Sequence, residues 1–148
     1  MRKRVPIPSM PGPELDNLLR SRGLRRTGAR VTVLRFVQAN PRPLSHGEVA
    51  EALADDGLDY ATVYRNLMDL AEVGILLRSD FGDHIWRFEL KKDDHDGADH
   101  PHFLCTDCGA VTCLPDGAVK VKPTPKVPRA VSKGNVVVQL RGLCDTCA

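Results

Sequence analysis

Segments with apolar side chains at helical spacing alternate with short breaks of Gly, Pro or polar residues as far as residue 74. Apolar positions 15, 18 and 19 predict a helix over residues 14–22, and positions 31, 34 and 37 predict a second helix beginning after Thr27. Ser45 and Glu48 have the spacing of a capping box, which predicts the start of a third helix. A fourth helix is expected from residue 59 or 60 to Gly74, because glycine is a common helix terminator.

Two short strands, ILLRS and HIWRFEL, follow the fourth helix and are joined by the turn residues 80–83. A set of three or four short helices followed by a two-stranded hairpin is typical of a winged helix-turn-helix, whose last helix enters the major groove of DNA. The sequence therefore predicts a winged-helix DNA-binding domain over residues 13–90. Residues 1–12 are basic and rich in proline, and we expect them to form a mobile arm.

Beyond residue 90 the apolar pattern becomes sparse. Residues 91–99 are polar and aperiodic, which indicates a hinge linker. The segments HFLC, AVTCL and NVVVQLRGLC then predict short strands, and four prolines between residues 115 and 134 argue against a helix there. We expect residues 100–148 to form a small, β-rich (α/β-type) domain that needs a cross-link to fold. The fold class predicted for the whole chain is α+β.

Four of the five cysteines form two C-x-x-C pairs: Cys105, Cys108, Cys144 and Cys147. Two such pairs can place four thiolates tetrahedrally around one structural Zn²⁺. The alternative is a pair of redox dithiols, although a thioredoxin-like C-x-x-C is expected in a βαβ context that this sequence lacks. The fifth cysteine, Cys113, is predicted to lie in a strand, where it is either a small buried hydrophobe, a metal ligand or a sensor thiol.

His100 and His102 alternate on a predicted strand, so their side chains point to one face and can share an ion. His84 and Glu89, at the end of the wing, are the candidates to complete the site. Imidazole and carboxylate ligands suit Zn²⁺, Fe²⁺, Mn²⁺ or Ni²⁺, which predicts a second, regulatory divalent metal. His46 is expected to be solvated in a loop.

The net charge of this 148-residue chain is only +2, but the charges are unevenly distributed. Residues 1–35 carry nine Lys or Arg against two acids, whereas residues 80–100 carry seven acids against three Lys or Arg. This pattern indicates either a DNA-binding half and a cation-binding half or an unevenly charged solvated surface. In the fourth helix, Thr62 and Tyr64 are expected to contact base edges or methyl groups and Arg65 a phosphate. The alternative is an ordinary amphipathic helix with a polar outer face.

No apolar run approaches the roughly 20 residues that a membrane helix needs. The basic N-terminus is not followed by the apolar stretch of a secretion signal. We therefore expect a cytoplasmic protein with no membrane partner, in which cysteines serve metal or redox chemistry rather than disulfides.

Taken together, GLRRTGARVTVL, PLSHGEVAEAL, ATVYRNLMDLAEVGIL and HPHFLCTDCGAV resemble the ferric uptake regulator (Fur) superfamily. The resemblance covers about residues 14–113 and resumes at RGLCDTC. It implies a homodimeric, metal-responsive repressor with an N-terminal winged helix and a C-terminal dimerisation domain. Such proteins bind AT-rich palindromic operators on double-stranded DNA, usually when loaded with metal.

The resemblance also implies roles for individual residues. Tyr64 matches a tyrosine that contacts thymine, Arg65 matches an arginine that contacts the DNA backbone, and Arg26 and Arg30 fall in a basic region that approaches DNA. The two C-x-x-C pairs match the structural zinc site. His100 and His102 match the sensing site, with Glu89 near its wing-end ligand.

Two features depart from the family pattern. The region after the first C-x-x-C pair, usually helical, is rich in proline over residues 115–128, and Val136 stands where a late histidine is expected. The sequence thus predicts a metal-responsive regulator, with no enzymatic activity and no small organic substrate. The alternatives are a DNA-binding protein with structural zinc only, or a C-x-x-C redox protein.

Overall fold

A computed structural model describes residues 11–91, 101–115, 117–134, 136 and 138–148. The chain divides into two compact units, residues 1–93 and 94–148, and each is considered by itself. The division falls within the predicted linker, of which only residue 91 is described. The predicted arm over residues 1–12 lies almost entirely outside the described residues. No described helix has the length and apolar character needed to span a membrane.

The described residues of the first unit form four α-helices: α1 (Gly12–Ser21), α2 (Gly28–Gln38), α3 (His46–Leu53) and α4 (Tyr60–Glu72). A 3₁₀ turn, η1 (Ala54–Asp56), follows α3. The predicted caps are confirmed: the Thr27 side chain accepts a hydrogen bond from the Arg30 amide, and Ser45 and Glu48 form a complete capping box. Each cap satisfies amides that a helix leaves unpaired at its N-terminus. These local signals therefore determine where α2 and α3 begin.

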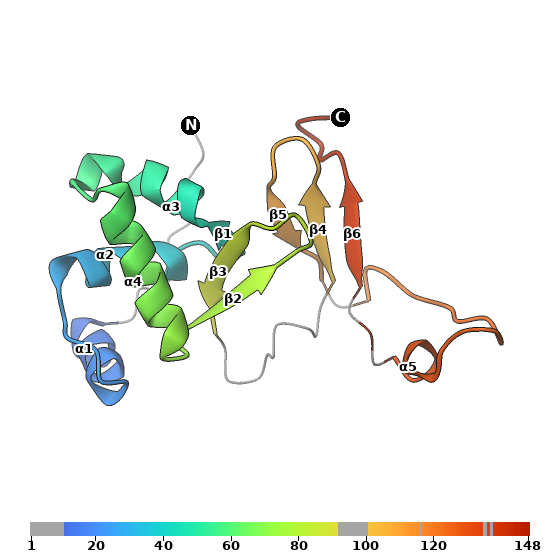
Figure 1. Ribbon diagram of the computed structural model, residues 1–148, viewed down its shortest axis with the longest axis horizontal. Coiled ribbons are helices and arrows are strands. Elements are labelled where there is room, and N and C mark those ends of the chain that lie inside the picture. Colours follow the sequence, from blue (N-terminus) through green and yellow to red (C-terminus); the bar gives the residue numbers. More distant parts are fainter. Residues whose placement is uncertain (1–10, 92–100, 116, 135, 137) are drawn as a thin grey trace. The chain divides into compact units, whose positions relative to one another are not determined.

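A three-stranded antiparallel sheet completes this unit, in the order β1 (Leu44–Ser45), β3 (Trp86–Leu90), β2 (Leu76–Asp80). The hairpin of β2 and β3 was predicted, and β1 was not. Two residues are too short to show a strand pattern, and β1 exists because Leu44 and Ser45 pair with Phe88 and Arg87. Figure 1 shows α4, in green, leading directly into β2.

One hydrophobic core joins the helices to this sheet. All four helices and all three strands contribute buried side chains, among them Leu15, Leu34, Val49, Leu67, Leu76 and Phe88. Complete burial of a Leu or Phe side chain stabilises a fold by about 1.5–3 kcal/mol. The core therefore holds α4 rigidly, with its apolar stripe inward and its polar face outward.

The second unit is a small sheet in the order β5 (Val111–Cys113), β4 (His102–Cys105), β6 (Gln139–Gly142). The central strand β4 is antiparallel to β5 and parallel to β6. Among the described residues of this unit, the buried apolar side chains are only Leu104, Cys105 and Val111. The expectation of a thinly apolar, β-rich domain agrees with this architecture.

The connection between β5 and β6 differs from its prediction in one respect. The sequence argued against a helix between residues 115 and 134, yet a single turn, α5 (Arg129–Ser132), forms there. It begins directly after Pro128, whose φ of −56° is already suited to the start of a helix. Proline prevents a helix only where it falls inside one, and Pro128 precedes the turn. Figure 1 shows the connection carrying α5 away from the three strands.

Candidate metal centre and nucleic-acid interface

The four predicted zinc ligands meet at one edge of the second sheet. Cys105 and Cys108 lie at the end of β4 and in the turn that follows it, and Cys144 and Cys147 come after β6. Because β4 and β6 are parallel, with Cys105 opposite Gly142, both pairs leave the sheet at the same end. The Thr106 amide donates to the Gly142 carbonyl at 2.8 Å, which ties the two turns together.

The geometry of the sulfurs suits a tetrahedral ion. The four Sγ atoms all lie within 4.8 Å of one another, and the Sγ atoms of Cys108 and Cys144 are 3.9 Å apart. With Zn–S bonds of about 2.3 Å, tetrahedral ligands lie about 3.8 Å apart. Four thiolates with this spacing fit Zn²⁺ in a structural site, and the chain has the donor set of a zinc protein.

Backbone amides prepare the cluster for a cation. The Cys144 amide donates to the Cys105 Sγ at 3.4 Å, and together with the Cys108 amide it lowers the pKa of the Cys105 thiol to about 6. A side-chain hydrogen bond with the Cys144 sulfur raises the pKa of the Cys147 thiol, because this bond favours the protonated form. A bound cation would reverse this preference, since metal ligation deprotonates thiols.

The predicted regulatory ligands fall in different places. His100 lies outside the described residues. His102 is buried on β4, opposite Cys113 on β5. Cys113 is only half-buried, so it is not the fully buried hydrophobe that one interpretation of the sequence offered.

The candidate wing ligands His84 and Glu89 lie at different places along the hairpin, and their joining one metal site stays a prediction. His84 lies in the β2–β3 turn, where its amide donates to Asp80 Oδ1 at 3.2 Å, and its side chain is 96% exposed. Glu89 lies towards the other end of β3, opposite Leu77. The three residue-to-residue steps from Trp86 to Glu89 already span about 10 Å of extended chain. The turn thus leaves the His84 imidazole exposed, whereas Glu89 lies within the strand pairing of the hairpin.

The candidate DNA-reading residues lie at the start of α4. The Asp59 side chain accepts a hydrogen bond from the Thr62 amide at 2.7 Å and so caps the helix. Hydrogen bonds from the Thr62 side chain and from its amide lower the pKa of Asp59, because they favour the carboxylate. Tyr64 and Arg65 are exposed on the outer face of α4, and Thr62 is half-buried. The second turn of α4 therefore offers an aromatic ring and a guanidinium to solvent.

His46 is part of this surface, although the sequence assigned it no role. Its Nε2 lies 2.8 Å from the Tyr60 carbonyl oxygen. Its ring centroid lies 3.8 Å from that of Tyr60 and 5.1 Å from that of Tyr64. The sequence predicted a solvated histidine in a loop, whereas His46 is the first residue of α3 and is half-buried.

The two basic residues expected to approach DNA differ in accessibility. Arg26 is exposed and forms an ion pair with Asp16. Arg30 is only 13% exposed, and its guanidinium donates to Asp69 Oδ2 at 2.8 Å and to the Arg25 carbonyl at 2.7 Å. The guanidinium of Arg30 joins α2 to α4, and its contact with DNA stays a prediction.

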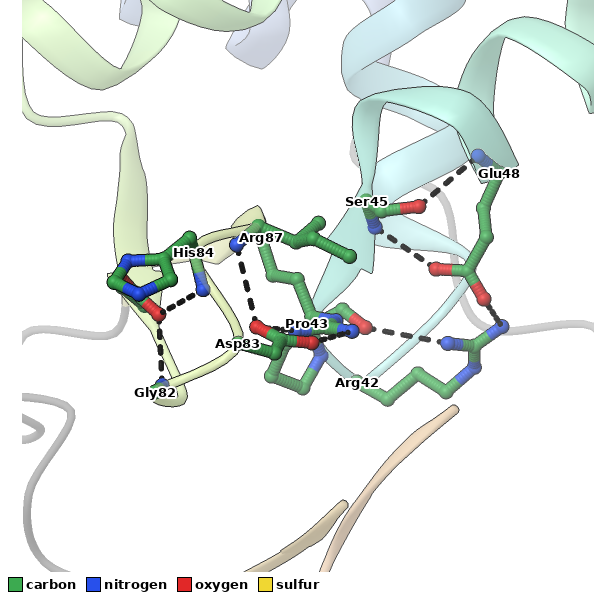
Figure 2. A network of polar contacts seen from close by, with 10 residues as sticks. Arg42, Pro43, Ser45, Glu48, Gly82, Asp83, His84 and Arg87 are labelled. Atoms are coloured by element: carbon green, nitrogen blue, oxygen red, sulfur yellow. Dashed lines mark hydrogen bonds and ion pairs between the residues drawn. The ribbon is translucent and has the colours of Figure 1, made fainter. Parts of the chain in front are cut away.

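The wing contains a second network that the sequence did not reveal. Figure 2 shows Asp83 and Arg87 facing each other, with Nη1–Oδ1 and Nη2–Oδ2 distances of 2.9 and 2.8 Å. Arg87 is 2% exposed, and it holds the pKa of Asp83 below its ordinary value. The four-residue spacing of Asp83 and Arg87 resembles a helical ion pair, so nothing local identified it as a turn clamp.

The same figure shows how β1 is attached to the start of α3. Arg42 donates to the Pro43 carbonyl at 3.2 Å and to Glu48 Oε1 at 3.1 Å, and Glu48 also accepts from the Ser45 amide at 2.8 Å. One carboxylate therefore joins the cap of α3 to the preceding loop.

Known proteins resemble this chain over both units. The ferric uptake regulator family matches residues 21–130. The chain is 39% identical to the ferric uptake regulation protein of Haemophilus ducreyi over 105 residues, which cover 66% of each protein. It is 35% identical to the ferric uptake regulation protein of Bordetella parapertussis over 135 residues, which cover 87% of this chain and 93% of that one.

Among solved structures, the ferric uptake regulator of Vibrio cholerae has a similar fold. It matches with a TM-score of 0.66 and 29% identity, covering 88% of this chain and 99% of that one.

Proposed function

This chain belongs to the ferric uptake regulator family of metal-responsive transcriptional regulators, and from that premise we propose that it is a homodimeric repressor of the cytoplasm. In this proposal the metal-loaded dimer binds an AT-rich palindromic operator, and the protein has no enzymatic activity. The observation that carries the proposal is the outer face of α4, where exposed Tyr64 and Arg65 stand on a helix that the core holds rigidly.

The chemistry of α4 suits duplex DNA. An aromatic edge can contact the thymine methyl group in the major groove, and a guanidinium can neutralise a phosphate. Arg26 and Arg30 add positive charge to the same unit and are assigned to DNA with Tyr64, and Arg30 also joins α2 to α4 through Asp69. Two copies of α4 in a dimer would read half-sites separated by one helical turn, about 34–36 Å, or a multiple of it.

The four-cysteine cluster has a structural role in this proposal. Zn²⁺, when bound, cross-links the ends of β4 and β6, and the chain supplies four sulfurs for it. The Cys144 amide holds the Cys105 sulfur in place before metal arrives. Because so few apolar side chains are buried in this unit, the cross-link is expected to supply most of its stability.

The regulatory response is assigned to a second divalent ion. We take His100 and His102 as its imidazole ligands, Glu89 as the candidate carboxylate and His84 as a further candidate nitrogen ligand. An ion of this kind changes operator affinity only if it binds the DNA-binding form of the protein more tightly than the other form. His102→Ala should therefore abolish the metal response while leaving the metal-free affinity unchanged.

The deciding experiment is an operator titration. Full-length protein with its cysteine site filled with zinc is titrated with further Zn²⁺, Fe²⁺, Mn²⁺ or Ni²⁺, and binding to an AT-rich palindrome and to a shuffled duplex is measured at fixed salt. We expect affinity for the palindrome alone to rise with added metal. Tyr64→Ala should reduce this preference by about 1–3 kcal/mol.

Exposed Glu51, on α3, provides the control substitution Glu51→Ala, which should leave binding unchanged. No metal effect on operator affinity would favour a DNA-binding protein with structural zinc only. Turnover of a disulfide substrate would favour the redox alternative. Sedimentation of the loaded protein as a monomer would contradict the dimer.

A further inference from the structure

A second pair of metal-binding side chains lies on the β4–β5 hairpin, apart from the four-cysteine cluster. His102 and Cys113 are register partners on antiparallel strands, so their side chains point to the same face of the sheet. Their ligand atoms, a ring nitrogen and Sγ, lie within 4.8 Å of each other. Because His102 and Cys105 are three residues apart on one strand, they point to opposite faces. The hairpin therefore carries an imidazole–thiol pair on the face away from Cys105.

The surroundings of this pair suit a bound ion. His102 is 6% exposed and Cys113 is half-buried, so an ion here would be only partly hydrated. A tetrahedral zinc ion separates a nitrogen and a sulfur ligand by about 3.6 Å, a distance that side-chain rotation can reach without changing the strand register. The Leu114 amide donates to the Pro101 carbonyl at 2.9 Å and extends the strand pairing past the two residues.

We propose that Cys113 is a thiolate ligand of the regulatory ion and that its sulfur makes this site select Zn²⁺ over Mn²⁺ and Fe²⁺. The inference rests on the proposed function, which takes His102 as a ligand of that ion. Thiolate is a soft ligand that favours zinc, whereas sites of imidazole and carboxylate alone also accept manganese and iron. A cysteine in this position therefore changes which metal the regulator senses.

Cobalt spectroscopy on the full-length protein tests this ligand directly. The four-cysteine site is first filled with Zn²⁺, which binds sulfur sites more tightly than Co²⁺ does, and one equivalent of Co²⁺ is then added. We expect a sulfur-to-cobalt charge-transfer absorption in the near ultraviolet. Cys113→Ser should remove that absorption and keep the visible bands of cobalt bound to nitrogen and oxygen.

Competition between metals gives a second measurement. Cys113→Ser should weaken Zn²⁺ binding at the second site by about tenfold or more and leave Mn²⁺ binding nearly unchanged, since only zinc gains from the thiolate. Thr112→Ser is the matched control, because Thr112 is the exposed neighbour on β5 and points to the other face. Circular dichroism of both variants, and of Cys113→Ala, checks that β4 and β5 remain paired.

The outcomes separate this inference from the proposed function. A second cobalt ion that binds without charge-transfer absorption, or an unchanged Zn²⁺/Mn²⁺ ratio in folded Cys113→Ser and Cys113→Ala, would overturn the role of Cys113 and leave the regulator proposal standing. If the wild-type protein binds no second ion at all, both proposals fail.

Discussion

At the start of α4, one imidazole contacts two exposed aromatic rings. His46 comes from α3, yet its Nε2 lies 2.8 Å from the Tyr60 carbonyl oxygen and its ring packs against Tyr60 and Tyr64. The conformational entropy cost of orienting the Tyr64 side chain arises once, either when the protein folds or when it binds DNA. A tyrosine that is already oriented loses less conformational entropy when it meets a base. His46 is therefore expected to contribute to DNA affinity without touching DNA.

Replacing this imidazole tests the idea at the residue scale. His46→Ala should lower operator affinity by about 1 kcal/mol, the usual contribution of an aromatic contact. His46→Phe keeps a ring and should retain most of the affinity. Fluorescence anisotropy with labelled operator measures both variants, and Glu51→Ala on the same helix is the control. Equal affinity of His46→Ala and wild type would show that Tyr64 needs no support.

At the scale of single elements, the β2–β3 hairpin depends on the Asp83–Arg87 clamp. Arg87 is almost fully buried, and breaking a buried ion pair by removing one charge costs about 3–5 kcal/mol. Trp86, the single tryptophan of the chain, begins β3 and reports on this hairpin by fluorescence.

Asp83→Asn should therefore destabilise the first unit by about 3 kcal/mol at pH 7 in urea unfolding followed by Trp86 fluorescence. Because Arg87 lowers the pKa of Asp83 in the folded state, the wild-type clamp is stabilising above pH 4 or so and is lost as the pH falls further. The variant should lack this loss, so the two unfolding free energies should converge in acid. Exposed Asp55 provides the control, Asp55→Asn; a constant difference at all pH values would contradict the clamp.

At the scale of the whole molecule, the two units differ in what holds them together. The first has a continuous apolar core over helices and sheet, and the second buries few apolar side chains and carries four convergent sulfurs. Removal of zinc should therefore unfold residues 94–148 and leave the first unit folded. Structural zinc contributes about 10 kcal/mol or more in small modules, more than so small a core can replace.

Hydrogen exchange with and without a chelator measures this difference unit by unit. Amide protection of β4 and β6 should vanish on zinc removal and in Cys105→Ser, while α2 and α4 stay protected. Thr146→Ala, an exposed change between Cys144 and Cys147, should behave as wild type. Persistent protection of β4 in the zinc-free protein would refute a structural role for the cluster.

Local patterns in the sequence were sufficient for the parts of this fold whose interactions are short in range. The caps at Thr27 and Ser45, the four helices and the β2–β3 hairpin follow from residues within a few positions of one another, because helix periodicity and capping are local. The two C-x-x-C pairs likewise predicted four sulfurs in one cluster, since their spacing is itself the geometric requirement of zinc.

Tertiary structure alone decided the features that depend on pairing between distant segments. Strand β1 exists only through β3, the Arg30 guanidinium meets Asp69 from 39 residues away on α4, and His46 meets two tyrosines of that helix. The parallel alignment of β4 with β6 and the register of His102 with Cys113 are of the same kind. A one-dimensional pattern records which residues are apolar or charged. Strand register and helix packing decide which of these residues share a face or form hydrogen bonds with each other, and both form only when the chain has folded.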